Sequence, residues 1–128
     1  MADRRCPCGT GLTYPACCGR LHEGAADAAT AEQLMRSRYS AFALGEAGYL
    51  LSTWHPRTRP RTLRLPEGVT WTSLAVLATS AGRLLDAEGT VEFRASYRTA
   101  DGPGAQHERS RFARVDGRWR YLDGVSLS

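Results

Sequence analysis

Lysine is absent from this sequence, so all 17 basic residues are arginines. We attribute this bias to overall composition first and to function only second. With 13 acidic residues the formal net charge is +4, and no basic segment is interleaved with aromatic side chains in the manner of an RNA-binding surface. The sequence therefore does not favour nucleic-acid binding.

Long apolar segments are absent as well. No stretch approaches the roughly 20 apolar residues that a membrane-spanning helix needs, and residues 1–5 do not lead into the apolar core of a secretory leader. We therefore expect no membrane association and a cytoplasmic location. A chain of 128 residues is long enough for one domain with a real hydrophobic core and a small appendage.

Cysteine is confined to the start of the chain, where a C-x-C pair is followed after eight residues by a C-C pair: Cys6, Cys8, Cys17 and Cys18. Four thiolates can close a tetrahedral Zn²⁺ site, the usual arrangement of a structural zinc. Gly9 and Gly11 allow a tight backbone turn, and N–H groups freed by that turn can donate to the sulfur atoms. Because four sulfurs leave no open coordination position, we predict a structural or docking role for the metal.

Two other interpretations of the cysteines stay open. Two disulfides would suit a small secreted domain, whereas clustered cysteines in a reducing compartment more often bind metal. Four unrelated thiols are the second alternative. His22, four residues after Cys18, is a possible substitute ligand, but with four sulfurs present we expect it to be a solvated neighbour.

The cysteine segment resembles the SEC-C zinc motif in Cys6-Pro7-Cys8-Gly9-Thr10-Gly11, in Tyr14 and in Cys17-Cys18-Gly19. That motif is best known from the C-terminal tail of the translocase ATPase SecA. The resemblance implies Zn²⁺ and contact with a SecB-like chaperone or with ribosomes. The usual motif continues with Ser-Gly-Lys, whereas this chain has Thr10-Gly11-Leu12 and no lysine for docking.

Two helices are predicted after a short linker over residues 21–29. Thr30 is a good N-cap and Gln33 completes a capping box, which predicts a helix over residues 31–46. A shorter helix over residues 47–54 should end at His55-Pro56, because the residue before a proline resists the helical conformation. Residues 57–68 follow as an arginine-rich loop.

The rest of the chain predicts antiparallel strands over residues 71–85, with a bend at 80–82, and over residues 91–99, 106–115 and 118–122. Val91, Phe93 and Ala95 alternate with polar residues and should face the core. Asp116-Gly117 is a hairpin dipeptide. Helices followed by hairpins predict an α+β fold, with the longer helix lying on one face of a curved sheet.

The order of these elements and several local sequences resemble the YchJ family. The matching segments are residues 31–42 (AEQLMRSRYSAF), Trp54-His55-Pro56, residues 89–93 (GTVEF), 107–112 (HERSRF) and 117–119 (GRW). The resemblance implies a SEC-C-like zinc-binding motif over residues 1–24 and a cone-shaped nuclear transport factor 2-like domain over residues 30–128. Some relatives carry a second SEC-C motif at the C-terminus, whereas this chain ends at Ser128. No reaction is implied.

Arg38 is the main candidate for a pocket in the cone. On a helical wheel it falls within the apolar face with Leu34 and Phe42, whereas Arg36 falls on the wet face. A buried arginine needs compensation by a nearby carboxylate or by ordered polar groups, and we predict that Arg38 points into the cone and pairs with Glu108 or Asp123. Snorkelling at the edge of the core and a purely structural ion pair are the alternatives.

Strand alternation places Glu108 inward with Ser110 and Phe112, and Asp123 on the same face of its strand as Trp119. Aromatic residues complete the candidate pocket, although each is also a natural core residue. The full set of candidate pocket residues is Arg38, Tyr39, Trp54, Glu108, Trp119 and Asp123.

Two functions are compatible with the sequence. The first, which the sequence favours, is a zinc-containing adaptor or chaperone-associated protein that docks through its SEC-C-like motif. The second is a small-molecule binder or enzyme that uses the cone, with Asp123, Glu108, His55 or His107 as a base. An enzyme is less favoured, because no nucleophile–base pair and no cofactor motif has a recognisable spacing. Metal removal should melt the zinc motif and leave the cone folded.

Overall fold

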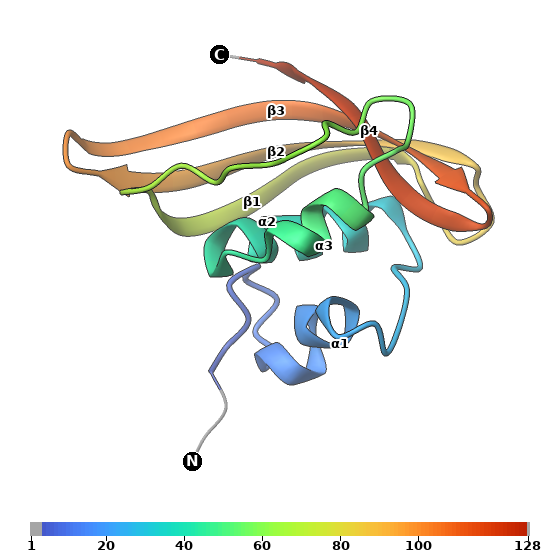
Figure 1. The fold of residues 1–128 in the computed structure, drawn as a ribbon, viewed down its shortest axis with the longest axis horizontal. Coiled ribbons are helices and arrows are strands. Elements are labelled where there is room, and N and C mark those ends of the chain that lie inside the picture. The colour runs from blue at the N-terminus through green and yellow to red at the C-terminus, as the bar shows by residue number, and fades with distance from the viewer. Residues whose placement is uncertain (1–3, 128) are drawn as a thin grey trace.

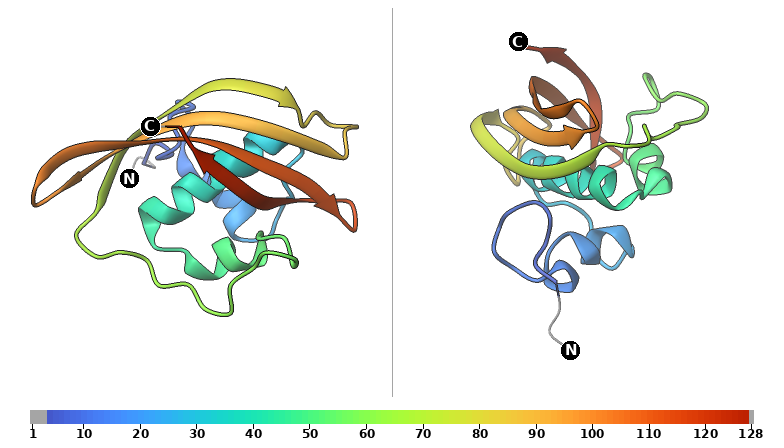
Figure 2. Two further views of the ribbon diagram at one scale, coloured as in Figure 1. Left: turned by 90° about the horizontal axis from the view of Figure 1, so that it is seen from above. Right: turned by 90° about the vertical axis from the view of Figure 1, so that its left-hand side faces the viewer.

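The computed structural model describes residues 4–127, which form three layers (Figure 1). A four-stranded sheet is the first layer, and helices α2 and α3 lie on one of its faces. The third layer is the cysteine-containing segment, which we call the knuckle (residues 4–24). It lies beneath the helices, on the side away from the sheet (Figure 2). The α+β fold is confirmed.

The sheet is an antiparallel meander in the order β1-β2-β3-β4. Its strands are β1 (Thr70–Ala81), β2 (Glu88–Thr99), β3 (Gly102–Val115) and β4 (Arg118–Ser126). The predicted inward residues Val91, Phe93 and Ala95 are all buried. Asp116 and Gly117 both have positive φ, as the tight hairpin turn between β3 and β4 requires.

Strand β1 ends at Ala81, within the bend predicted at residues 80–82, so residues 82–85 do not continue the strand as predicted but turn the chain back towards β2. Ala81 and Gly82 have positive φ. A Cβ on Gly89 would lie only 2.3 Å from the Cα of Gly82, so the two backbones approach each other closely. Glycine is required at both positions for this close approach. The end of β1 also lies against the start of α2, because Ala31 N donates a hydrogen bond to Gly82 O.

Helix α2 (Ala31–Leu44) begins as the sequence predicts. The Thr30 side chain accepts a hydrogen bond from the Gln33 N–H, and the Gln33 side chain accepts one from the Ala29 N–H. The helix ends at Leu44, two residues earlier than predicted, and Gly45 caps it with a φ of 78°. Helix α3 (Ala47–Ser52) follows directly. No helix within residues 4–127 is both long and apolar enough to cross a bilayer.

Helix α2 is buried on opposite sides, because it lies between the sheet and the knuckle. Met35 and Tyr39 face the sheet core. On the other side, Ser37 and Ser40 are buried against the knuckle, and Arg36 donates to the Cys8 carbonyl at 2.9 Å. The prediction that Arg36 lies on a water-exposed face is therefore only partly confirmed, since the knuckle covers part of that face and leaves the Arg36 side chain 24 % exposed.

The knuckle contains a 3₁₀ turn over Tyr14–Ala16 and helix α1 (Cys18–His22). Helix α1 extends into the segment that we predicted to be a linker. Its close approach to the 3₁₀ turn requires Gly19, where a Cβ would lie 2.7 Å from the Tyr14 carbonyl oxygen. Cys6, Cys8 and Cys18 are buried in the same apolar cluster as residues of α2 and the sheet. The knuckle is therefore packed on the cone and does not project from it as a free appendage.

Candidate metal centre and cone pocket

The four cysteines converge to one point between the knuckle loop and α2. Their Sγ atoms all lie within 4.8 Å of one another, with 3.6 Å between Cys8 and Cys17 and 4.0 Å between Cys17 and Cys18. All four are free thiols. A tetrahedral site with metal–sulfur distances near 2.3 Å needs sulfur–sulfur distances of about 3.8 Å. The arrangement can therefore hold a metal ion.

Hydrogen bonding among the sulfur atoms shifts their pKa values in opposite directions: it lowers the pKa of Cys8 and, together with burial, raises that of Cys18. Burial also raises the pKa of Cys17. Gly9 and Gly11 have φ values of 85° and 87°, so the predicted tight turn is present. The Thr10 hydroxyl lies 3.3 Å from Cys17 Sγ. Hydrogen bonds, chiefly from Cys18 and then from the Thr10 backbone, lower the pKa of Cys8 to about 4 against the opposing effect of burial.

His22 is neither a metal ligand nor a solvated neighbour in this structure. Its Nε2 lies 2.8 Å from the Ser37 carbonyl oxygen, and its Nδ1 lies 2.6 Å from the Tyr14 hydroxyl. Because a carbonyl can only accept, Nε2 carries the proton and Nδ1 accepts from Tyr14 in the neutral ring. His22 also packs on the Tyr49 ring at 4.5 Å. It therefore joins the knuckle to α2 and α3.

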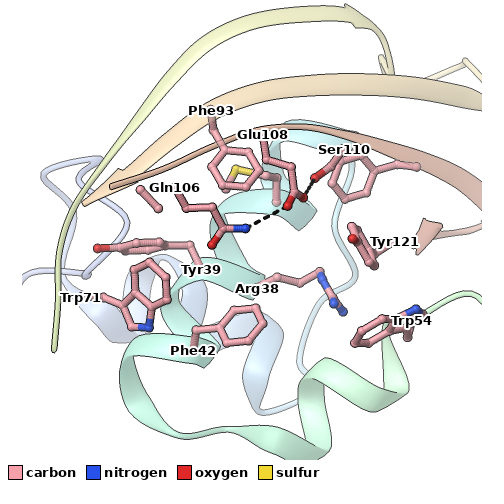
Figure 3. Close-up of a pocket in the computed structure, with 13 residues that line it drawn as sticks. Arg38, Tyr39, Phe42, Trp54, Trp71, Phe93, Gln106, Glu108, Ser110 and Tyr121 are labelled. Atoms are coloured by element: carbon pink, nitrogen blue, oxygen red, sulfur yellow. Dashed lines mark hydrogen bonds between the residues drawn. The ribbon is translucent and has the colours of Figure 1, made fainter. Parts of the chain in front are cut away.

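A cavity of about 150 Å³ opens between α2 and the inner face of the sheet. One wall is aromatic and the other carries polar groups from α2 and β3 (Figure 3). The lining residues are Met35, Arg38, Tyr39, Phe42, Trp54, Trp71, Phe93, Ala95, Gln106, Glu108, Ser110, Phe112 and Tyr121. Four of the six predicted pocket residues, Arg38, Tyr39, Trp54 and Glu108, thus lie together.

Arg38 is 6 % exposed and packs against the neighbouring rings of Trp54 and Tyr121 (Figure 3). Its Cζ is 4.5 Å from the centre of the Tyr121 ring and 5.1 Å from that of Trp54. Its Nη1 donates to the Leu50 carbonyl at 2.8 Å and to the Thr53 hydroxyl at 2.7 Å. Burial lowers the pKa of Arg38 to about 10. Within residues 4–127, neither its Nε nor its Nη2 makes a hydrogen bond, and no carboxylate lies within ion-pair distance of the guanidinium.

The predicted ion pair of Arg38 is therefore wrong for both candidate partners. Glu108 faces the same cavity, but its carboxylate accepts hydrogen bonds from Gln106 Nε2 at 2.8 Å and from the Ser110 hydroxyl at 2.6 Å. Its charge acts on Arg38 only through space, and it raises the pKa of Arg38 less than burial lowers it. Asp123 pairs with Arg111 outside the cavity.

A β-bulge explains the position of Asp123. Phe112 pairs with Tyr121 and the adjacent Arg111 pairs with Asp123, so Leu122 is an extra residue in β4. One extra residue reverses the alternation of side chains along a strand. Tyr121 therefore faces the cavity, whereas Asp123 lies on the outer face with Arg111.

Trp119 belongs to the core and does not line the cone pocket. It is 1 % exposed, and its Nε1 donates to the Ala29 carbonyl at 3.1 Å, next to the N-terminus of α2. The sequence analysis missed Tyr121, Phe42, Gln106 and Ser110 as pocket residues. Of these, Phe42, Ser110 and Tyr121 could have been found, because they share a predicted face with Arg38, Glu108 and Trp119 respectively.

The two histidines considered as bases lie away from the cavity. His55 Nδ1 accepts from the Arg57 N–H in the loop after α3. His107 Nε2 lies 2.7 Å from Glu92, on the outer face of the sheet. Neither lines the cone pocket.

We expect Arg38→Met to change the free energy of unfolding by no more than about 1 kcal/mol. The pKa of about 10, against 12.5 for a free arginine, corresponds to a cost of about 3 kcal/mol for burying the charge at all pH values below 10. The substitution removes this cost, which stabilises the fold. It also removes the hydrogen bonds and ring contacts of Arg38, which together contribute about 2–4 kcal/mol, so the two effects nearly cancel. Urea unfolding at pH 7 measures the difference. A loss above about 3 kcal/mol, typical of a broken buried ion pair, would show that a carboxylate does compensate Arg38.

Comparison with known proteins agrees with this architecture. Residues 30–124 match a model described as "YchJ, middle NTF2-like domain". A UPF0225 protein from Streptomyces coelicolor is 59 % identical over 127 residues, covering 99 % of each chain. The solution structure of a SEC-C motif containing protein from Rhodopseudomonas palustris is 36 % identical with a TM-score of 0.84, covering 96 % of this chain and 98 % of that one. The crystal structure of a SEC-C motif containing protein from Psychrobacter arcticus is 31 % identical with a TM-score of 0.79, covering 98 % of this chain and 84 % of that one.

The fold and the cysteine cluster define a SEC-C motif protein with a nuclear transport factor 2-like domain. Within that class, the chain belongs to the YchJ family, whose members include the UPF0225 proteins. The resemblance noted from the sequence is thus confirmed for the family and for the fold.

Proposed function

We propose that this protein binds a small molecule in the cone pocket and carries a structural Zn²⁺ on Cys6, Cys8, Cys17 and Cys18. The observation that carries the first part is Arg38, a buried cation without an acidic partner in the wall of an aromatic cavity. A residue that only packs the core would not be expected to be an arginine without an acidic partner, because burying a charge is costly. A pocket with a few polar groups on an apolar wall is the usual form of a ligand site.

Zn²⁺ is the metal that best matches the donor set. Four cysteine sulfurs in a tetrahedral arrangement are the usual ligands of structural zinc, and no donor position is left for a substrate. Three of the four cysteines are buried against α2. We therefore propose that the metal orders the knuckle and thereby covers the outer face of α2, with residues 1–24 as the metal-binding unit and 30–128 as the cone.

An adaptor function is the second candidate. The tip of the knuckle loop stays exposed, and Leu12 at that tip is 51 % exposed, so a partner such as a SecB-like chaperone or the ribosome could contact it. We favour the pocket, because the cysteine face of the knuckle is packed against α2 and because the loop carries no lysine.

The ligand-binding function predicts that compact ring-bearing molecules perturb the pocket and not the knuckle. We expect a set of single-ring fragments of mixed charge to include binders that shift the NMR signals of Phe93, Ala95 and Ser110, because these line the cavity. The amides of Thr10 and Leu12 serve as the internal control. Shifts confined to the knuckle, or no shifts for any fragment, would contradict the proposal.

A further inference from the structure

We infer that the ligand of the cone pocket is a compact monocyclic carboxylic acid that also bears a hydroxyl or amino group. This inference rests on the proposed ligand-binding function and names the chemical class of the ligand. It follows from three features of the cavity: an open edge of Arg38, a volume that fits one ring, and a carboxylate that faces the same space.

The anion-binding feature is the guanidinium of Arg38. Its Nη1 is saturated by Leu50 and Thr53, whereas no acceptor within residues 4–127 binds its Nε or Nη2. The guanidinium packs against the adjacent rings of Trp54 and Tyr121 (Figure 3), so these contacts and the two hydrogen bonds of Nη1 set its orientation before any ligand arrives. A guanidinium edge with two adjacent N–H donors matches the two oxygens of a carboxylate.

The size and walls of the cavity select the body of the ligand. A volume of about 150 Å³ equals that of cavities that hold one benzene molecule. Tyr39, Phe42 and Trp71 form the aromatic wall next to Arg38 (Figure 3), where the rings of Tyr39 and Trp71 meet edge to face at 6.1 Å. An aromatic or compact alicyclic ring fits this wall, because offset and edge-to-face ring contacts are favourable.

The third feature, Glu108, determines the other polar group of the ligand. Gln106 and Ser110 each donate to one of its oxygens, which fixes the carboxylate in the cavity and leaves further lone pairs for a ligand donor. Its negative charge disfavours a second anionic group nearby and favours a hydroxyl or amino group. Arg38 and Glu108 form no ion pair, so their charged atoms lie more than 4.0 Å apart, and both groups line the same cavity.

The same charges argue against a phosphate ligand. Arg38 is the one cationic residue that lines the cavity within residues 4–127, and Glu108 opposes it. A dianionic phosphate ester would gain from one cation and be repelled by the carboxylate, whereas a monoanionic carboxylate is balanced by Arg38 alone.

The test is a titration of the full-length protein with matched single-ring probes by isothermal calorimetry. Benzoate, 3-hydroxybenzoate and 4-hydroxybenzoate are compared with benzyl alcohol, which is neutral, and with phenyl phosphate. We expect at least one hydroxybenzoate to bind most tightly and benzyl alcohol to bind about 10- to 100-fold more weakly, the range for a charge-assisted hydrogen bond to a buried group.

Variants separate the roles of the two polar residues. Arg38→Met should remove the preference for benzoate over benzyl alcohol, and Arg38→Lys should restore part of it. Glu108→Gln should remove the preference for hydroxybenzoates over benzoate. Arg109→Met is the control, because Arg109 is exposed on the outer face of the sheet, and it should leave all affinities unchanged.

Three outcomes would overturn the inference. If benzyl alcohol bound as tightly as the carboxylate probes or more tightly, the pocket would still bind ligands, but the inference that its ligand is a carboxylic acid would be refuted. Tighter binding of phenyl phosphate would refute the assigned anion. Binding of none of the probes, while other fragments still shift the signals of Phe93 and Ser110, would refute the ligand class and leave the proposed function standing.

Discussion

Removing the proposed Zn²⁺ is expected to unfold the knuckle while the sheet stays folded. Binding of Zn²⁺ to a cysteine site of this kind contributes about 10–16 kcal/mol at pH 7, far more than the few apolar groups of residues 4–24 can supply. The face of α2 that would then be exposed carries Arg36, Ser37 and Ser40, which water can solvate. The cone should therefore lose stability but not its fold.

The measurement is metal analysis combined with amide NMR before and after chelation. We expect one equivalent of Zn²⁺ in the purified protein, collapse of the signals of residues 4–24 on chelation, and retained signals for β2 and β3. Cys18→Ser should reproduce the chelated spectrum, whereas Leu12→Ala, an exposed change in the same loop, should retain the metal. A single transition that unfolds β2 and β3 together with the knuckle would show that the two parts form one cooperative unit.

Trp119→Ala is expected to lower the free energy of unfolding by about 3–5 kcal/mol, the range for truncating a fully buried aromatic residue. Trp119 is 1 % exposed, joins β4 to the residue before the α2 cap through Ala29, and supports the Arg114 guanidinium 4.5 Å above its ring. The substitution therefore leaves a cavity and removes a hydrogen bond that connects the sheet to the start of α2.

Arg118→Ala is the matched control, because its neighbouring ion pair with Asp27 is exposed on both sides and should be worth less than about 1 kcal/mol. Urea unfolding of both variants measures the difference. The folded fraction of Trp119→Ala should still bind pocket ligands, since Trp119 does not line the cone pocket. A small loss of stability together with a loss of ligand binding would show that Trp119 belongs to the pocket after all.

Much of the candidate site could be predicted from local patterns. The four cysteines lie within one loop and its adjoining helix, so their convergence depends on short-range spacing and on turns at Gly9 and Gly11. Arg38 was predicted in the pocket wall from the period of α2, and Glu108 from the alternation of β3. These predictions hold because each depends on the geometry of a single regular element.

The partner of Arg38 could not be predicted in this way, because it depends on two elements at once. Its hydrogen bonds go to Leu50 and Thr53 at the end of α3, and only the packing of α3 beside α2 brings those groups within reach. The sequence-based expectation of an acidic partner followed from the cost of a buried charge. The structure meets part of that cost with a carbonyl, a hydroxyl and two rings.

By itself, the sequence determined the α+β class, the cap and period of α2, the inward residues of β2 and β3, and the cysteine cluster. Each of these follows from backbone periodicity or from the chemistry of a short segment. Tertiary structure alone decided which face of α2 meets water, because a second layer covers Arg36 and Ser40. It also decided the position of Asp123, because the extra residue Leu122 reverses the side-chain alternation of β4 only once β4 is paired with β3.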